Sequence, residues 1–118
     1  MGSMSKRKGA AGERELAKAL NELLGCSAYR SQQYCGAAGD SDVAGVPGIH
    51  VESKRTEALQ LYPAVAQAVS DAVDGDLPVV FHRRNGKPWV AICQLTDLVE
   101  LSRRILAIVD APAKEQPL

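Results

Sequence analysis

The order in which helix-like and strand-like segments follow one another limits the folds open to this chain more than any other feature of its sequence. Apolar residues recur at helical spacing over three stretches, at about residues 10–24, 61–72 and 96–109. Strand-like runs lie between them, at 27–33, on both sides of a turn at 46–48, at 78–83 and at 89–95. This order predicts an α/β fold in which helices cover a mixed β-sheet.

Turn and cap residues predict where these elements begin and end. Val46-Pro47-Gly48 has the composition of a tight turn, and Asn85-Gly86 is the strongest short hairpin signal in the chain. Gly25 provides a stop for the first helix, and Thr96 is the expected N-cap of the last one. We therefore expect two antiparallel hairpins and an additional helix at the C-terminus.

The length and the cysteine content favour a single domain without disulfides. Residues 1–3 precede a second methionine and look like a cloning remnant, so we expect one domain over 4–109 and a polar tail over 110–118. No apolar run approaches the ~18 residues of a membrane span, which predicts a cytoplasmic protein with no membrane partner. An odd number of widely spaced cysteines predicts reduced thiols at Cys26, Cys35 and Cys93.

The charges of the chain balance, with fourteen basic and fourteen acidic residues. A net charge of zero argues against a protein that coats nucleic acid indiscriminately. The basic residues nevertheless gather in small clusters, namely Lys6-Arg7-Lys8, Arg30, Lys54-Arg55 and Arg83-Arg84 with Lys87. Such clusters are compatible with a phosphate-binding face, although composition alone does not establish one.

One carboxylate of the first helix points where the core is expected. Each residue advances a helix by about 100°, which places Glu13 in the middle of the apolar stripe and Glu15 on the opposite, solvated side. The stripe consists of Leu16, Ala17, Leu20 and Leu24. A buried carboxylate without a partner costs several kcal/mol, so Glu13 needs a partner. Alternatively, Glu13 lies half in water at the helix N-terminus and is stabilised by the helix dipole.

A second group of charges lies on the strand "HVESKRT" (50–56) and the turn before it. Alternation along a strand places His50, Glu52 and Lys54 on one face. Asp42 and Glu52 would lie on paired strands of the hairpin, where a divalent cation such as magnesium would offset their repulsion. The alternatives are an exposed Glu52–Lys54 ion pair and a polar turn at "GDSD". Asp40 is expected to be a bystander, but in a shifted register it would replace Asp42 in the site.

Together these residues resemble the PD-(D/E)XK nuclease superfamily, in the form D-x9-E-x-K from Asp42 through Glu52 to Lys54. A closer similarity is to the archaeal-type Holliday junction resolvases and their phage and bacterial relatives. It rests on "RKGAAGERELAKAL", Arg30-Ser31, Asp42-Val43 and "HVESK", and spans roughly residues 6–93. The resemblance implies a restriction-endonuclease-like core. The neutral net charge and the extra C-terminal helix depart from the resolvase pattern.

The resemblance also implies roles for individual residues. Glu13, Asp42 and Glu52 would bind Mg²⁺, or Mn²⁺ in its place, with the carbonyl of Ser53 as a further ligand. Lys54 would orient the attacking water and stabilise developing charge, and Gln67 stands where many such nucleases have an accessory helix glutamine. These roles are chemically coherent, since phosphodiester hydrolysis needs an activated water and positive charge on the phosphate. The expected DNA contacts are Arg14, Arg30, Arg55, Arg83 and Arg84.

Three functions agree with this pattern. The first is a structure-selective endonuclease that cuts four-way or branched DNA as a homodimer, in the cytoplasm of its own cell or, if phage-encoded, of a host. The second is a PD-(D/E)XK nuclease with another target, such as nicking, repair or restriction. The third is a non-catalytic DNA-binding module. Apolar residues of the last helix either cover the sheet or meet a partner, namely Leu98, Leu101, Ile105 and Ile108. His50 and His82 are expected to be packed or solvent-edge histidines rather than ligands, and Trp89 a core anchor rather than a base-stacking platform.

Overall fold

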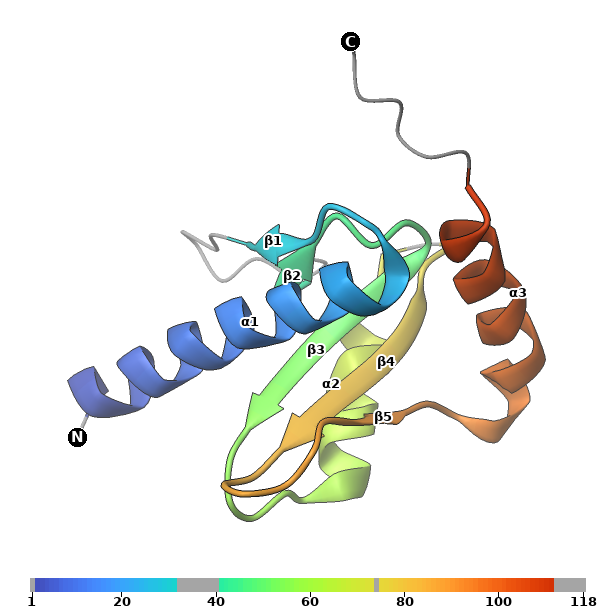
Figure 1. Cartoon of the computed structure of the whole chain (residues 1–118). Coiled ribbons are helices and arrows are strands. Elements are labelled where there is room, and N and C mark those ends of the chain that lie inside the picture. Colours follow the sequence, from blue (N-terminus) through green and yellow to red (C-terminus); the bar gives the residue numbers. More distant parts are fainter. Residues whose placement is uncertain (1, 32–40, 74, 112–118) are drawn as a thin grey trace, which may run out of the picture.

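A five-stranded mixed sheet with helices on both faces organises the chain, as the computed structural model shows for residues 2–31, 41–73 and 75–111 (Figure 1). The elements follow in the order α1 (Gly2–Leu24), β1 (Tyr29–Arg30), β2 (Val43–Ala44), β3 (Ile49–Arg55), α2 (Leu61–Asp71), β4 (Leu77–Arg83), β5 (Val90–Ile92), the 3₁₀ turn η1 (Leu95–Asp97) and α3 (Leu98–Val109). The predicted α/β class and the mixed sheet flanked by helices are therefore confirmed.

The strands lie in the order β1-β2-β3-β4-β5 across the sheet. β1 with β2, β2 with β3 and β4 with β5 are antiparallel, whereas β3 and β4 run parallel and are joined by α2. Both predicted hairpins are present. The left-handed conformation that each turn needs is supplied by Gly48 (φ 77°) and Gly86 (φ 74°).

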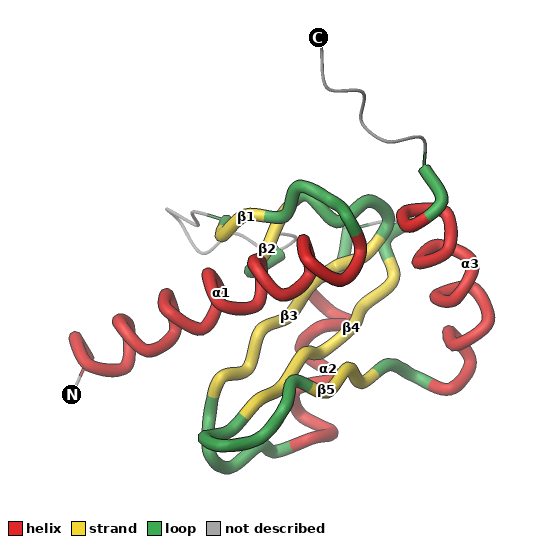
Figure 2. The backbone as a smooth tube through the Cα atoms, in the orientation of Figure 1, coloured by secondary structure: helices red, strands yellow, loops and turns green. Residues whose placement is uncertain are grey.

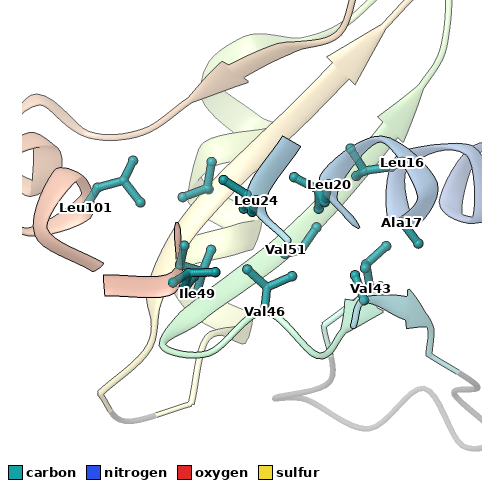
Figure 3. Packing of buried hydrophobic residues seen from close by; sticks show 12 residues of the cluster. Leu16, Ala17, Leu20, Leu24, Val43, Val46, Ile49, Val51 and Leu101 are labelled. Atoms are coloured by element: carbon teal, nitrogen blue, oxygen red, sulfur yellow. The ribbon is translucent and has the colours of Figure 1, made fainter. Parts of the chain in front are cut away.

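The two faces of the sheet have separate cores. On one face, the predicted stripe of α1 packs on Val43, Ile49 and Val51, and α3 adds Leu101 and Ile108 (Figure 3). On the other face, Ala64 and Ala68 of α2 pack on Val80 of β4. Figure 2 shows α1 in front of the strands and α2 behind them. Alternate residues of β3 therefore face different helices, with Ile49 and Val51 toward α1.

Two expectations about the elements are wrong in detail. The apolar spacing that predicts the second helix includes Leu61 and Val69, but both are exposed, and it is Ala64 and Ala68 that pack on the sheet. Thr96 does not cap α3. The chain first makes a 3₁₀ turn, in which the Asp97 N–H donates to the Gln94 carbonyl, and α3 begins after it. Of the apolar residues of the last helix, for which both covering the sheet and meeting a partner were left open, Leu101 and Ile108 are buried and Leu98 is exposed.

The bounds of the first elements also differ from expectation. α1 begins at Gly2 instead of near residue 10, and it ends at Leu24, followed by Gly25 in the expected left-handed conformation (φ 71°). The expected strand at 27–33 is reduced to Tyr29–Arg30 in the part that the structure describes. Cys26 and Cys93 are free thiols, as predicted. Asp40 and Cys35 lie outside the described residues, as do the side chains of Lys6-Arg7-Lys8.

Arg104 of α3 connects two loops at the end of the sheet where β3 and β4 begin. Its guanidinium Nη1 donates to the carbonyl of Gly48 at 2.7 Å and also to the carbonyl of Gly75. The Gly48 carbonyl accepts a second bond, from the N–H of Leu77 at 3.0 Å.

None of the helices in the described ranges is both long enough and apolar enough to span a bilayer.

Candidate active site

Asp42 lies directly before β2, where the hairpin brings it beside β3. Its N–H donates to the Val51 carbonyl at 2.9 Å, and its carboxylate Oδ2 accepts from the Ser53 N–H at 2.7 Å. Val43 faces Val51 in the register of the two strands, so Asp42 is level with Glu52. The structure therefore places these two carboxylates on neighbouring strands, as the hairpin pattern predicts.

Glu52 is a buried carboxylate, 4% exposed, with a partner for each oxygen. Oε1 lies 3.0 Å from His50 Nε2, and Oε2 lies 3.8 Å from Lys54 Nζ. All three residues belong to the face of β3 that is turned toward α2, which confirms the predicted alternation. Because both oxygens have polar neighbours, the burial of this charge is compensated and its orientation is defined.

Lys54 has a second partner on α2. Its Nζ donates to Gln67 Oε1 at 2.9 Å, so the structure does bring together the two side chains that the resemblance associates. Beside them lies an open hollow of about 370 Å³ between the end of β3 and the start of α2, lined in part by Lys54, Thr56, Gln60 and Gln67. The ammonium group is thus held in place and still borders open space.

Glu13 has a partner, as its position in the apolar stripe requires. Its Oε1 accepts from Arg30 Nε at 2.9 Å, and its side chain is only 20% exposed. The alternative of a half-solvated residue at the helix N-terminus is wrong, because α1 begins at Gly2 and Glu13 lies well inside it. Burial raises the pKa of Glu13, opposed by Arg30 and Arg14 and reinforced by the charge of Glu52.

The carboxylates of the site destabilise one another. The pKa of Asp42 is raised to about 6, mainly by burial, and the charges of Glu52 and Glu13 raise it further. The hydrogen bond from the Ser53 N–H and the charge of Lys54 act in the opposite direction. Three acidic side chains from α1, β3 and the start of β2 therefore share one region of negative potential.

The oxygen donors of this region suit a hard divalent cation, whose charge would offset the repulsion between the carboxylates. Within the described ranges, however, no three carboxylate, histidine or cysteine side chains are arranged to hold a metal ion. Glu13 is engaged with Arg30, and one oxygen of Glu52 with His50. Ser53 pairs with Phe81 in the parallel register, and its carbonyl as a ligand stays a prediction.

The arginines expected to contact DNA are not equally available. Arg55 lies within 4 Å of both Glu15 and Glu57 and donates to the carbonyl of Arg83, with only 15% of its side chain exposed. Arg83 lies 2.9 Å from Glu15, and Arg30 is engaged with Glu13. Arg14 and Arg84 are exposed. Much of the expected basic face is thus neutralised by intramolecular ion pairs.

Glu15 is not the ordinary solvated helix residue that its phase predicts. Its Oε1 lies 2.9 Å from Arg83 Nη1 and 3.4 Å from Arg55 Nε, so it joins α1 to β4 and β3. The helix phase itself is right, because Glu13 and Glu15 do point to different regions. The sequence prediction failed because the face expected to be solvated lies against the arginines of the sheet.

His50 is the residue of this region whose contacts the sequence did not predict. It is fully buried, and its ring joins Ser41 Oγ, 3.1 Å from Nδ1, to Glu52 Oε1, 3.0 Å from Nε2. The alternation of β3 shows that His50 shares a face with Glu52, but it gives neither the burial nor the contact with Ser41. His82 and Trp89 are packing residues as expected, since His82 contacts the Thr56 carbonyl and Trp89 packs against the core.

Comparisons with known proteins leave the chemistry of this region as the main guide to function. No protein-family model, no curated protein and no solved structure matches the chain.

Proposed function

We propose that the protein is a metal-dependent DNA endonuclease of the PD-(D/E)XK type that acts on four-way (Holliday) or other branched DNA. The observation that carries this proposal is the convergence of Asp42, Glu52 and Lys54 at one point of the sheet. Asp42, directly before β2, lies level with Glu52 of β3, and Lys54 lies 3.8 Å from Glu52. Glu13 of α1 is close enough to couple electrostatically with both carboxylates.

The sheet supports assignment to the restriction-endonuclease-like fold. A helix is followed by antiparallel strands, and a helix then connects β3 to a parallel neighbour. The acidic residue precedes β2, and the E-x-K residues lie near the C-terminal end of β3. Ligands in α/β folds commonly bind at the C-terminal ends of parallel strands, which agrees with a site at this position.

In the proposed site, Asp42 and Glu52 hold Mg²⁺, which Mn²⁺ can replace, and the Ser53 carbonyl is a further oxygen donor. Glu13, which pairs with Arg30 in this structure, would be a further carboxylate ligand. When bound, the metal supplies positive charge at the scissile phosphate. His50 keeps Glu52 oriented through the bond to Oε1, as partners of metal-binding side chains commonly do.

Lys54 is the second source of positive charge in the proposed mechanism. Gln67 and Glu52 hold its ammonium group, which borders the hollow beside α2. From this position Lys54 orients the attacking water and stabilises the negative charge that develops on the phosphate. Because its partners are fixed before substrate arrives, little reorganisation is needed during the reaction.

A four-way junction must be cut on two strands, and one chain of this size holds one such site. We therefore propose a homodimer with two sites related by a two-fold axis, acting in the cytoplasm. The ion pairs of Arg55 and Arg83 limit the positive charge available for ordinary duplex DNA. This favours a target that is recognised by shape over one that is bound by charge alone.

A cleavage assay tests the proposal. Four-way junction, fork, linear duplex and single-stranded DNA are incubated with the protein in Mg²⁺ and in EDTA. We expect Mg²⁺-dependent cutting of the junction and the fork, and none in EDTA. Glu52→Gln should abolish cleavage while the circular dichroism melt stays cooperative, and Glu22→Gln, an exposed change on α1, should cut like the wild type.

Other outcomes separate the alternatives. Equal cutting of linear duplex would replace the junction target with a repair, nicking or restriction-like one. Binding of branched DNA without cleavage in Mg²⁺ or Mn²⁺ would favour a non-catalytic module. A folded Glu52→Gln protein with full activity would show that the active site is assigned wrongly.

A further inference from the structure

The helix α3 carries a second apolar stripe that points away from its own core. Its buried side chains, Leu101 and Ile108, face the sheet. Five large apolar side chains of η1 and α3 are instead exposed, between 49% and 82%, namely Leu95, Leu98, Val99, Leu106 and Val109. At about 100° per residue, the four positions within α3 gather on one side of the helix, next to the buried side, and Leu95 lies in the 3₁₀ turn just before them. Figure 1 shows α3 at the edge of the molecule. The exposure of these side chains shows that this side of the helix faces solvent.

The exposed stripe is nearly symmetric about Ser102. Leu98 and Leu106 lie four residues to either side of it, and Leu95 and Val109 lie seven to either side. Three residues to either side are Val99 and the half-buried Ile105. A two-fold axis through Ser102 would therefore pair apolar residues with apolar residues along an antiparallel helix pair. This spacing is that of any apolar helix face, but it makes the stripe complementary to itself, apolar against apolar, which suits a second copy of the chain.

Ser102 suits a close helix crossing. Its side chain is small, and its hydroxyl already donates to the carbonyl of Val99 at 2.7 Å, so burying it would leave no donor unsatisfied. The charged side chains nearby are also satisfied within the helix, because Glu100 pairs with Arg103 and with Arg104. Nothing in the stripe itself is charged.

We propose that α3 is the homodimer interface, in which two copies pair their α3 helices antiparallel about a two-fold axis at Ser102. This adds an interface to the homodimer of the proposed function, but it stands on α3 and does not require nuclease activity. One helix face is small beside the ~800 Å² per partner of a standard interface, so we expect a dissociation constant in the micromolar range.

A competing surface exists on α2. Tyr62 and Val69 are exposed there, and Val73, just beyond the end of the helix, is exposed as well. This stripe is shorter, and it adjoins Gln67 and the hollow beside Lys54, which DNA must reach in the proposed function. The α2 surface therefore serves as the matched control for α3.

Sedimentation velocity of the full chain, from about 1 to 200 µM and without DNA, tests the interface. We expect a reversible monomer–dimer equilibrium in the wild type. Leu106→Glu should weaken it more than ~100-fold, because two carboxylates would be buried per dimer. Val69→Glu should leave it unchanged. A wild-type monomer at 200 µM, or a dimer that Val69→Glu disrupts and Leu106→Glu does not, would overturn the proposal.

Cross-linking tests the axis directly. In a background with Cys26, Cys35 and Cys93 replaced by serine, Ser102→Cys should form an intermolecular disulfide under mild oxidation, since the two thiols would meet at the axis. Arg103→Cys, one residue further and off the stripe, should form much less. Equal cross-linking of both variants would contradict the two-fold axis. Melting curves of each variant show that the fold is retained.

Discussion

At the scale of single residues, Asp42 lowers the stability of the fold when it is ionised, and it is also a proposed metal ligand. Its pKa is raised from 3.8 to about 6 in the folded, metal-free protein. The stability that this shift represents is present in full below pH 3.8 and is lost as the pH rises through about 6. An ionised Asp42 therefore weakens the fold at neutral pH unless a cation is bound.

We expect Asp42→Asn to stabilise the metal-free protein at pH 8, by on the order of 1–3 kcal/mol in the free energy of unfolding. The amide oxygen can still accept from the Ser53 N–H, so the hairpin should not be disturbed. At pH 4 the gain should be close to zero. Denaturant unfolding in EDTA at the two pH values measures this difference, with Glu22→Gln as the exposed control. An equal gain in the free energy of unfolding at both pH values would contradict the raised pKa of Asp42.

The pair Glu13 and Glu15 gives a second prediction at this scale. Glu13→Gln should abolish cleavage, because an amide is a poor ligand for a divalent cation. Glu15→Gln should leave cleavage largely intact but lower the stability by about 1 kcal/mol or less, since the ion pairs with Arg83 and Arg55 are partly screened by solvent. Nuclease rates and melting temperatures, recorded on the same preparations, separate the two effects. A loss of activity in both variants would mean that the ion pairs of Glu15 also support the site.

At the scale of elements, the contact between α1 and β3 decides where Glu13 lies. Gly12 is buried against Arg55, and a Cβ added to Gly12 would come within 2.6 Å of the Arg55 Cβ. That atom is fixed to the strand and cannot swing away. Close approach of the helix at Gly12 is thus what brings the neighbouring residue, Glu13, to the edge of β3.

Gly12→Ala should therefore destabilise the protein and lower cleavage, because α1 must move away from β3. The matched control is Gly9→Ala. A Cβ at Gly9 meets no atom within 4 Å, so this change should stabilise the protein by about 0.5–1 kcal/mol through helix propensity. The melting temperatures of the two variants should move in opposite directions, and only Gly12→Ala should cleave more slowly. A stabilised and fully active Gly12→Ala protein would show that the contact is not needed.

The sequence predicts the elements and the E-x-K face well, because both depend on local periodicity. Alternation alone places His50, Glu52 and Lys54 on one side of β3, and the stripe of α1 indicates that Glu13 needs a partner. The identity of that partner, Arg30, depends on how α1 lies across β1, which no local pattern encodes. The ion pairs of Glu15 and the burial of His50 likewise arise only when distant segments pack together. The packing of Ala64 on β4, and the exposure of Leu61 and Val69 on the same helix, could not be predicted for the same reason.

At the scale of the whole molecule, DNA binding should depend on the few basic groups that ion pairs leave available. Arg84 is exposed, whereas Arg83 is held by Glu15. We expect Arg84→Glu to weaken junction binding and to reduce the slope of log affinity against log salt by about 1. Arg83→Glu should weaken junction binding mainly by destabilising the fold, because it removes the ion pair with Glu15. Titrations in Ca²⁺ at several salt concentrations, with melting curves as control, distinguish the two. An unchanged slope in Arg84→Glu would exclude this arginine from the DNA contacts.

Arg104 helps to determine where the charged side chains of β3 lie, because it fixes the alignment of the strands. By bonding the loops that precede β3 and β4, it fixes the starting points of two parallel strands relative to each other. Side chains of a strand alternate with a period of two, so a slip of one residue would turn Glu52 and Lys54 into the apolar layer and send Val51 and Ser53 toward α2. A cation on the last helix, far along the chain from the acidic residues, thus protects the strand alignment on which every carboxylate distance in the molecule depends.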